Sequence, residues 1–147
     1  MSQYYDRGDE TLWNPSNGAS RLFLRQVAVF EEELDLPSGI GPMVSDECQV
    51  DPAALGVFAH ALLARHRQTP HAVVRALTEG FLITVLALAE RAGVELHGAA
   101  SLSAAPASEF RDLQISANGS AADNEDSQAW EEELRGRARE LGRFLAR

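Results

Sequence analysis

The residues that could do chemistry are concentrated in one segment, residues 37–52, with the sequence PSGIGPMVSDECQVDP. It contains Asp46, Glu47 and Asp51 together with Cys48, the only cysteine of the chain. Carboxylates ligate hard cations, and a thiolate is a soft metal ligand or a nucleophile. The spacing matches neither a calcium loop nor a zinc knuckle, and the neighbouring acids raise the thiol pKa. We therefore predict a buried, unreactive Cys48 and solvated acids, with Asp51 as a helix cap.

Histidines are the second group of candidates, at His60, His66 and His71. His66 lies on the apolar stripe of a predicted helix, where a partly buried, hydrogen-bonded imidazole is the ordinary role. No pair of these histidines has the four-residue spacing of a helical zinc motif. The sequence predicts no metal site, no cofactor and no catalytic residue.

Trp13 is the third candidate, because it immediately precedes the first predicted helix. We expect its ring to close one end of the core, as in a hydrophobic staple; the alternative is an aromatic lid over a ligand pocket. A single pocket lined by Trp13, Cys48 and His66 would favour a ligand-binding domain or an enzyme. Separation of these three side chains would count against it.

Size and composition limit the class of protein. A chain of 147 residues suits one domain, and at this size roughly 68–70% of the unfolded surface can be buried. A single cysteine cannot form an internal disulfide, which excludes a disulfide scaffold and indicates a reducing compartment. The first residues, MSQYYDRGDE, lack the basic and apolar regions of a signal peptide. We therefore expect a cytoplasmic protein.

Charge and hydropathy narrow the possible partners. The net charge of -9 opposes the phosphates of nucleic acids and favours a basic protein partner. The longest apolar stretch, Phe81–Ala89, is far shorter than the roughly 20 residues of a membrane span. We expect a buried helix there and no membrane association.

Three cap-plus-proline pairs, Asn14-Pro15, Asp51-Pro52 and Thr69-Pro70, predict helix starts. The polar side chain accepts from the first turn, and proline suits the first helical position, although Ser16 or Asn17 can also cap the first helix. Apolar residues then recur at helical spacing. The helices are expected near residues 15–34, 52–67, 70–92 and 128–146.

The third predicted helix is expected to be central. Leu77 and Phe81 lie on its main apolar face, and Leu82 and Leu86 add apolar groups outside that stripe, so more than one side is buried. The predicted fold is mainly α: a compact bundle of about four helices with a buried third helix and a long irregular loop.

The chain divides into three predicted parts. Residues 1–96 form a helical core domain. Residues 97–127 are mostly small, polar or acidic, and cannot bury enough apolar area to offset the entropy of ordering, so we predict a mobile linker. Within it, Phe110, Leu113 and Ile115 could dock as a short strand or turn. Residues 128–147 form an amphipathic helix, capped by Ser127, that packs on the core or on a partner.

Several of these motifs carry a resemblance to a known group. The Trp13–Gly18 sequence WNPSNG, the Gly39–Pro42 turn GIGP, the Asp46–Cys48 sequence DEC and the pair Asp51-Pro52 resemble a group of small uncharacterised proteins of high-GC Gram-positive bacteria. The resemblance covers about residues 2–93. It implies no activity and transfers no catalytic residue, but it favours a shared role for the loop and for Trp13.

Two functional hypotheses follow. We favour a non-enzymatic acidic interaction protein, such as an immunity-like or accessory factor, because the chain is acidic and has no catalytic constellation. Its candidate binding residues are Trp13, Asp46, Glu47, Cys48 and His66. The alternative is a small helical ligand-binding domain or enzyme that uses the acidic loop at residues 46–51 with one histidine.

Overall fold

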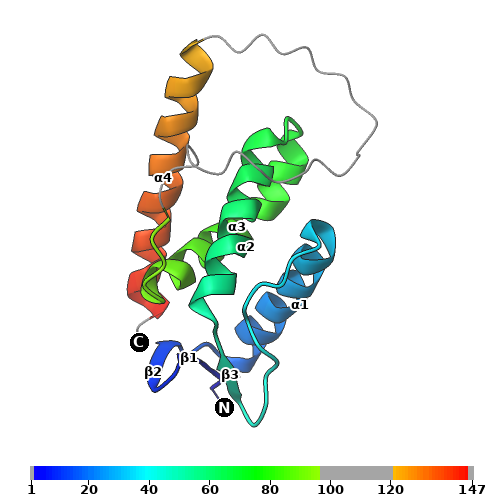
Figure 1. The fold of residues 1–147 in the computed structure, drawn as a ribbon, viewed down its shortest axis with the longest axis vertical. Coiled ribbons are helices and arrows are strands. Elements are labelled where there is room, and N and C mark those ends of the chain that lie inside the picture. Colours follow the sequence, from blue (N-terminus) through cyan, green and yellow to red (C-terminus); the bar gives the residue numbers. More distant parts are fainter. Residues whose placement is uncertain (1, 97–120, 146–147) are drawn as a thin grey trace.

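The computed structural model describes residues 2–96 and 121–145, and over residues 121–127 it describes the backbone alone. Its elements are β1 (Tyr4–Arg7), β2 (Glu10–Trp13), α1 (Asn17–Leu34), β3 (Glu47–Gln49), α2 (Pro52–Gln68), α3 (Ala72–Arg91) and α4 (Ala121–Leu145). The described residues thus form four helices and a small sheet at one end (Figure 1). The prediction of a mainly α fold with four helices is confirmed.

The sheet was not predicted from the sequence. β1 is the central strand, antiparallel to β2 and parallel to β3, and Tyr5 lies opposite Cys48 in the parallel pair. The strands have only three or four residues, so an alternating apolar pattern has no room to develop. The sheet is joined to the C-terminal end of α3 by two arginines: Arg7 donates to the carbonyl of Ala92, and Arg91 donates to the carbonyl of Leu12.

The segment between α1 and α2 is fixed by backbone contacts. The N–H of Gly41 donates to the carbonyl of Gln49 at 2.9 Å, and the N–H of Asp51 donates to that of Gly39 at 2.7 Å. Gly39 has φ of 76°, and a Cβ atom there would lie 2.6 Å from the Asp51 carbonyl oxygen, so only glycine fits. The predicted long irregular loop therefore contains β3 and lies tightly against the start of α2.

The starts of α1 and α2 follow the capping chemistry of the sequence. At α1 the predicted Asn14-Pro15 start is wrong and the alternative cap Ser16 is used: it accepts from the N–H of Ala19 at 3.4 Å, and the helix begins at Asn17. Asp51 accepts from the N–H of Ala53 at 2.9 Å, with Pro52 as the first residue of α2. These starts are set locally, because side chain and helix terminus are within three residues of each other.

The predicted start of the third helix is wrong. Thr69 ends α2 instead of capping α3: its N–H and its hydroxyl both donate to the carbonyl of Arg65, at 3.1 and 2.9 Å. α3 begins at Ala72, after His71, which makes no side-chain capping bond. Thr69 serves the preceding helix because that helix presents unpaired carbonyls at its C-terminus, which a hydroxyl can satisfy.

The C-terminal half of α3 is the centre of the core. Residues buried along it are Phe81, Leu82, Ile83, Val85, Leu86, Ala87, Leu88 and Ala89. The Phe81 ring is stacked on Phe30 of α1 at 4.7 Å between centroids and lies 5.6 Å from Phe23 and 6.5 Å from Phe58. By length and mean hydropathy, 1.8 over 18 residues, α3 could cross a membrane, but 44% of that window is buried against the rest of the fold.

The N-terminal half of α3 is open on one side, which contradicts the predicted burial of Leu77. Leu77 is 73% exposed and Val73 is 59% exposed. At 3.6 residues per turn, Leu77 is displaced from Phe81 by only about 40° around the helix. Both side chains thus share one face of α3, but among the described residues α1 covers only the Phe81 end of it.

α4 packs along α3 and buries Leu134 and Ala138. It begins at Ala121, so it is longer at its N-terminus than the helix predicted to start after Ser127. Residues 97–120, which include most of the predicted linker and its Phe110, Leu113 and Ile115, lie outside the described residues.

Candidate functional site

The five candidate residues fall into two separate groups. Trp13, Asp46, Glu47 and Cys48 lie in or beside the sheet, at one end of α2. His66 lies near the other end of α2. At 1.5 Å per residue, the helix places His66 about 22 Å from the Asp51 cap. The structure therefore does not form the single pocket lined by Trp13, Cys48 and His66 that would have favoured a ligand-binding domain or an enzyme.

Trp13 and Cys48 lie on either side of Tyr5. The Trp13 ring is 5.1 Å from Tyr5 and 5.2 Å from Phe23, and it packs against the core as predicted. Cys48 is fully buried, and its thiol donates to the carbonyl of Gly41 at 3.0 Å. Burial, helped by the charge of Asp6, raises the pKa of the Cys48 thiol to about 11. The structure thus confirms the predicted burial of Cys48. Because a buried thiol of raised pKa is a poor nucleophile, we still expect it to be unreactive.

The three loop acids differ in how far their side chains are held by other residues. Asp46 has φ of 66°, and its carboxylate accepts from Gln3 Nε2 at 3.3 Å. Asp51 caps α2, as predicted. Glu47 is exposed at the start of β3. Within residues 2–96 and 121–145, no group of three or more histidine, cysteine, aspartate or glutamate side chains could hold a metal ion.

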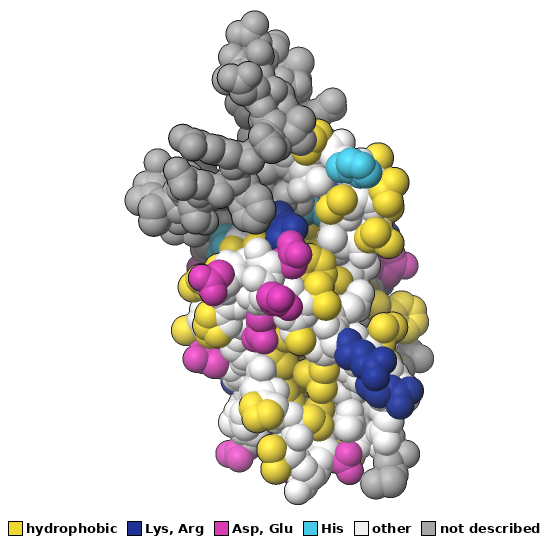
Figure 2. Space-filling model, turned by 90° about the vertical axis from the view of Figure 1, so that its right-hand side faces the viewer, with side chains coloured by type: hydrophobic (Ala, Val, Ile, Leu, Met, Phe, Trp, Pro, Cys, Tyr) yellow, Lys and Arg dark blue, Asp and Glu magenta, His cyan; other side chains and the backbone are white. Residues whose placement is uncertain are grey.

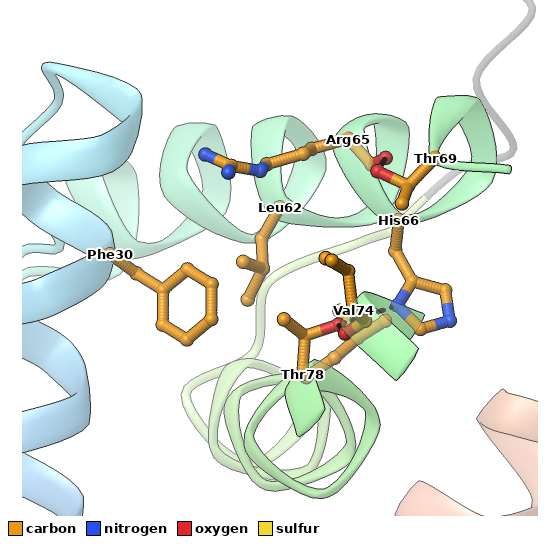
Figure 3. A pocket seen from close by; sticks show the side chains of 8 residues that line it. Phe30, Leu62, Arg65, His66, Thr69, Val74 and Thr78 are labelled. Carbon is orange, nitrogen blue, oxygen red and sulfur yellow. Dashed lines mark hydrogen bonds between the residues drawn. The ribbon is translucent and has the colours of Figure 1, made fainter. Parts of the chain in front are cut away.

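His66 is enclosed between α2, α3 and α4. Its ring is stacked on Trp130 at 5.0 Å between centroids and 7° between planes, and Nδ1 lies 3.0 Å from the Thr78 hydroxyl (Figure 3). That hydroxyl donates to the carbonyl of Val74 at 2.9 Å. With the hydroxyl proton directed to Val74, Thr78 accepts from Nδ1–H of His66. Burial, together with the nearby Arg75 guanidinium, lowers the pKa of His66. This is the satisfied, buried imidazole expected from the sequence.

Two cavities lie near these helices. The one beside His66 has a volume of about 10 Å³, and it is lined by Phe30, Leu62, Arg65, His66, Thr69, Val74, Thr78 and Leu82. A volume of this size admits about one water molecule. The second, of about 180 Å³ between α3 and α4, is lined by two arginines, but Arg135 is paired with Glu131 and Arg139 with Glu90. Neither cavity presents an unpaired charged group to a ligand.

A surface feature that the sequence did not single out as a site lies at the C-terminus of α1. We call it the acidic end of α1; it consists of Glu31, Glu32, Glu33 and Asp35. Figure 2 shows acidic side chains grouped on the face that carries α1. The signal in the sequence is the run EEELD, which places three glutamates in the last turn of a helix.

The contacts of the acidic end are few. Glu31 accepts from the N–H and the hydroxyl of Ser38, at 2.8 and 2.6 Å, and Glu33 is paired with Arg65 at 2.5 Å. Glu32 and Asp35 are exposed and make no ion pair with any residue that the structure describes. The last turn of α1 contains no basic residue. The group therefore presents uncompensated negative charge to solvent.

Comparisons with known proteins give a family but no activity. A model described as a family of unknown function, DUF6086, matches residues 1–147. No curated protein and no solved structure matches the chain. The family supports the resemblance to an uncharacterised group, while the shared motifs and the bacterial source stay predictions. Because the match covers the whole chain, the protein belongs to the DUF6086 family.

Proposed function

We propose that this protein is a non-enzymatic interaction protein, of the immunity-like or accessory kind, that binds a basic protein partner through the acidic end of α1. The observation that supports this proposal is the grouping of four carboxylates around a helix C-terminus with one arginine, Arg65, as their described counter-ion. The net charge of the whole chain, -9, has the same sign.

The position of these acids is unfavourable for folding. The C-terminus of a helix carries a partial negative charge, so an acidic side chain there costs typically 0.3–1 kcal/mol where a basic one would stabilise. Asp35 adds a second cost, because it holds a left-handed conformation at φ of 51° without being glycine. Glu31 and Glu33 have partners within the fold, in Ser38 and Arg65. Local stability gives no such account of Glu32 and Asp35, and a partner of opposite charge would supply one.

Electrostatic complementarity explains what such a surface does. Acids on one partner and bases on the other raise the association rate and exclude partners of the wrong sign, and salt screens the effect. Asp46 and Glu47 have the same sign and lie at the sheet end of the protein, so we retain them as a secondary contact. The ligand-binding or enzymatic alternative has no comparable support, because its candidate residues are either apart or buried and paired.

The test measures association rates after charge reversal. The partner would be captured with the tagged protein from its native host at low salt, and its association rate would be measured across a salt series. The double substitution Glu32→Arg/Asp35→Arg changes the net charge from -9 to -5, as does the control Asp46→Arg/Glu47→Arg. We expect the rate to fall with salt, on the order of tenfold or more, and the Glu32/Asp35 variant to be slower than the control.

A rate that is independent of salt and of both double substitutions would show that the interaction is not electrostatic. A slower rate in the control variant alone would move the binding surface to the loop at residues 46–51.

A further inference from the structure

The apolar face of α3 continues beyond the end of α1. We call the uncovered part the open seam; it consists of Val73, Val74 and Leu77 of α3, with Phe30 and Leu62 at its base. Phe30, Leu62 and Val74 line the small cavity drawn in Figure 3, where α1, α2 and α3 meet. Val73 and Leu77 are more than half exposed. Large apolar side chains that are exposed side by side in this way mark interaction surfaces.

The spacing of the seam suits a helix. Phe81, Leu77 and Val74 are separated by four and three residues, so they form one ridge along α3. α1 packs on the Phe81 end of this ridge through Phe30 and ends at Leu34. A second helix placed beyond α1 would continue the same packing along the rest of the ridge. Ridges of one helix fit the grooves of another, and apolar residues at i, i+3, i+4 and i+7 provide the anchors.

The charge around the seam indicates that a helix bound there would be positively charged. Arg65 lines the cavity at the base of the seam and is paired with Glu33 of the acidic end of α1. The seam therefore meets the acidic end of α1 at Glu33, and a helix seated in the seam lies beside that group of acids. Figure 2 shows hydrophobic side chains beside the acidic group on this face.

We propose that the open seam seats an amphipathic, basic helix of a protein partner, with its apolar face on Leu77 and its basic residues toward the acidic end of α1. This inference rests on the proposed function and names the chemistry of the partner. A small molecule does not fit, because the cavity holds only about one water molecule.

Other occupants have the wrong charge. A second copy would bring four more carboxylates into the same contact, since a symmetric interface pairs one surface with itself. The chain's own residues 97–120 contain two acids and one arginine, a net negative charge.

The test uses two synthetic Leu/Lys peptides of identical composition and a fluorescent label. In the first, leucines recur at i, i+3, i+4 and i+7; in the second, they are spread evenly around the helix. Binding to the full chain is measured by fluorescence anisotropy. We compare wild type with Leu77→Asp, and with the matched control Leu22→Asp, which alters an exposed leucine on the N-terminal half of α1, 63% exposed against 73% for Leu77. Both variants are expected to keep the wild-type melting temperature.

We expect the amphipathic peptide to bind wild type about tenfold or more tightly than the scrambled peptide, a difference of about 1.4 kcal/mol. Leu77→Asp should remove this preference, and Leu22→Asp should leave it unchanged. Glu32→Arg/Asp35→Arg should weaken binding of both peptides. Amide NMR shifts on binding should map to Val73, Val74 and Leu77.

The outcomes separate the two proposals. If charge reversal weakens binding but the peptides bind equally and Leu77→Asp has no effect, the seam is not the site, while the electrostatic function stands. If no substitution changes binding, both proposals are wrong. Self-association of wild type that Leu77→Asp abolishes would assign the seam to a second copy. A cross-linker at position 77 that reacts only with residues 97–120 of its own chain would assign it to that segment. Either result would overturn the proposal that the seam binds a helix of a partner.

Discussion

Replacement of Phe81 by alanine should destabilise the protein far more than replacement of Leu77, although these residues are one turn apart on one face of α3. Phe81 is 2% exposed and Leu77 is 73% exposed. Loss of a buried phenyl ring removes its transfer free energy and leaves a cavity, which together cost about 3–5 kcal/mol. The Phe81 ring contacts three others, at 4.7, 5.6 and 6.5 Å, so the cavity cannot close without moving α1 or α2. We expect a loss near 4 kcal/mol, as an order of magnitude.

Leu77→Ala should change the free energy of unfolding by about 0.5 kcal/mol or less, because the side chain is mostly in water in both states. Alanine also has the higher helix propensity. For a chain of this size a loss of 1 kcal/mol lowers the melting temperature by roughly 2–4 °C. Phe81→Ala should thus melt about 10 °C below wild type and Leu77→Ala within about 2 °C of it.

The assay is urea unfolding followed by circular dichroism, with thermal melting as a second measurement. Equal m-values are required, since a changed slope would mean that the unfolded or native ensemble had changed. A loss at Leu77 comparable to that at Phe81 would show that Leu77 is covered in solution, and the open seam would not exist. A loss below about 1 kcal/mol at Phe81 would mean that the aromatic cluster is not the core.

Three further predictions follow from single side chains. The pKa of His66 is lowered in the native state, whereas a histidine in the unfolded chain has its ordinary pKa near 6.5. Below about pH 6.5 the unfolded chain therefore binds a proton that the native state does not, and the free energy of unfolding should fall as the pH drops. His66→Phe should flatten the pH dependence of the urea midpoint between pH 6.5 and 5, and an unchanged slope would contradict this origin. Cys48, with a pKa near 11 and no exposed surface, should react with a thiol reagent only as fast as the protein opens; rapid stoichiometric labelling of native protein would contradict its burial. Gly39→Ala should destabilise the protein by more than about 1 kcal/mol, because φ is positive there and the new Cβ meets the Asp51 carbonyl. Gly136→Ala, in open space on α4, should stabilise it by up to about 1 kcal/mol. Equal urea midpoints for the two variants would refute this account of the loop.

The candidate site could be predicted only where a residue's role depended on its neighbours in sequence. The ordinary tendency of a free cysteine to be buried and the apolar stripe around His66 were enough to predict a buried thiol and a buried imidazole. The raised pKa of Cys48 has another cause than the predicted one: it comes from burial and from Asp6, not from the acids beside Cys48 in the sequence. The separation of Cys48 from His66 follows from the length of the predicted helix at residues 52–67, which lies between them. The acidic end of α1 was visible as three consecutive glutamates, but its place beside the cavity that Val74 lines depends on how α1 packs against α2 and α3.

The features of the fold can likewise be divided into those that the sequence predicts and those that depend on tertiary structure. The sequence by itself determined four helices and the capping of α2 by Asp51, because these follow from interactions over a few residues. It also predicted a turn at Gly39, but the contact with Asp51 that admits only glycine there joins positions twelve residues apart. Tertiary structure alone decided the sheet, since Tyr5 and Cys48 are paired across 43 positions in strands too short to show a pattern. It also decided that Phe81 is buried and Leu77 exposed. Helical periodicity defines an apolar face, but burial depends on whether another element is long enough to cover it, and α1 ends before it covers Leu77.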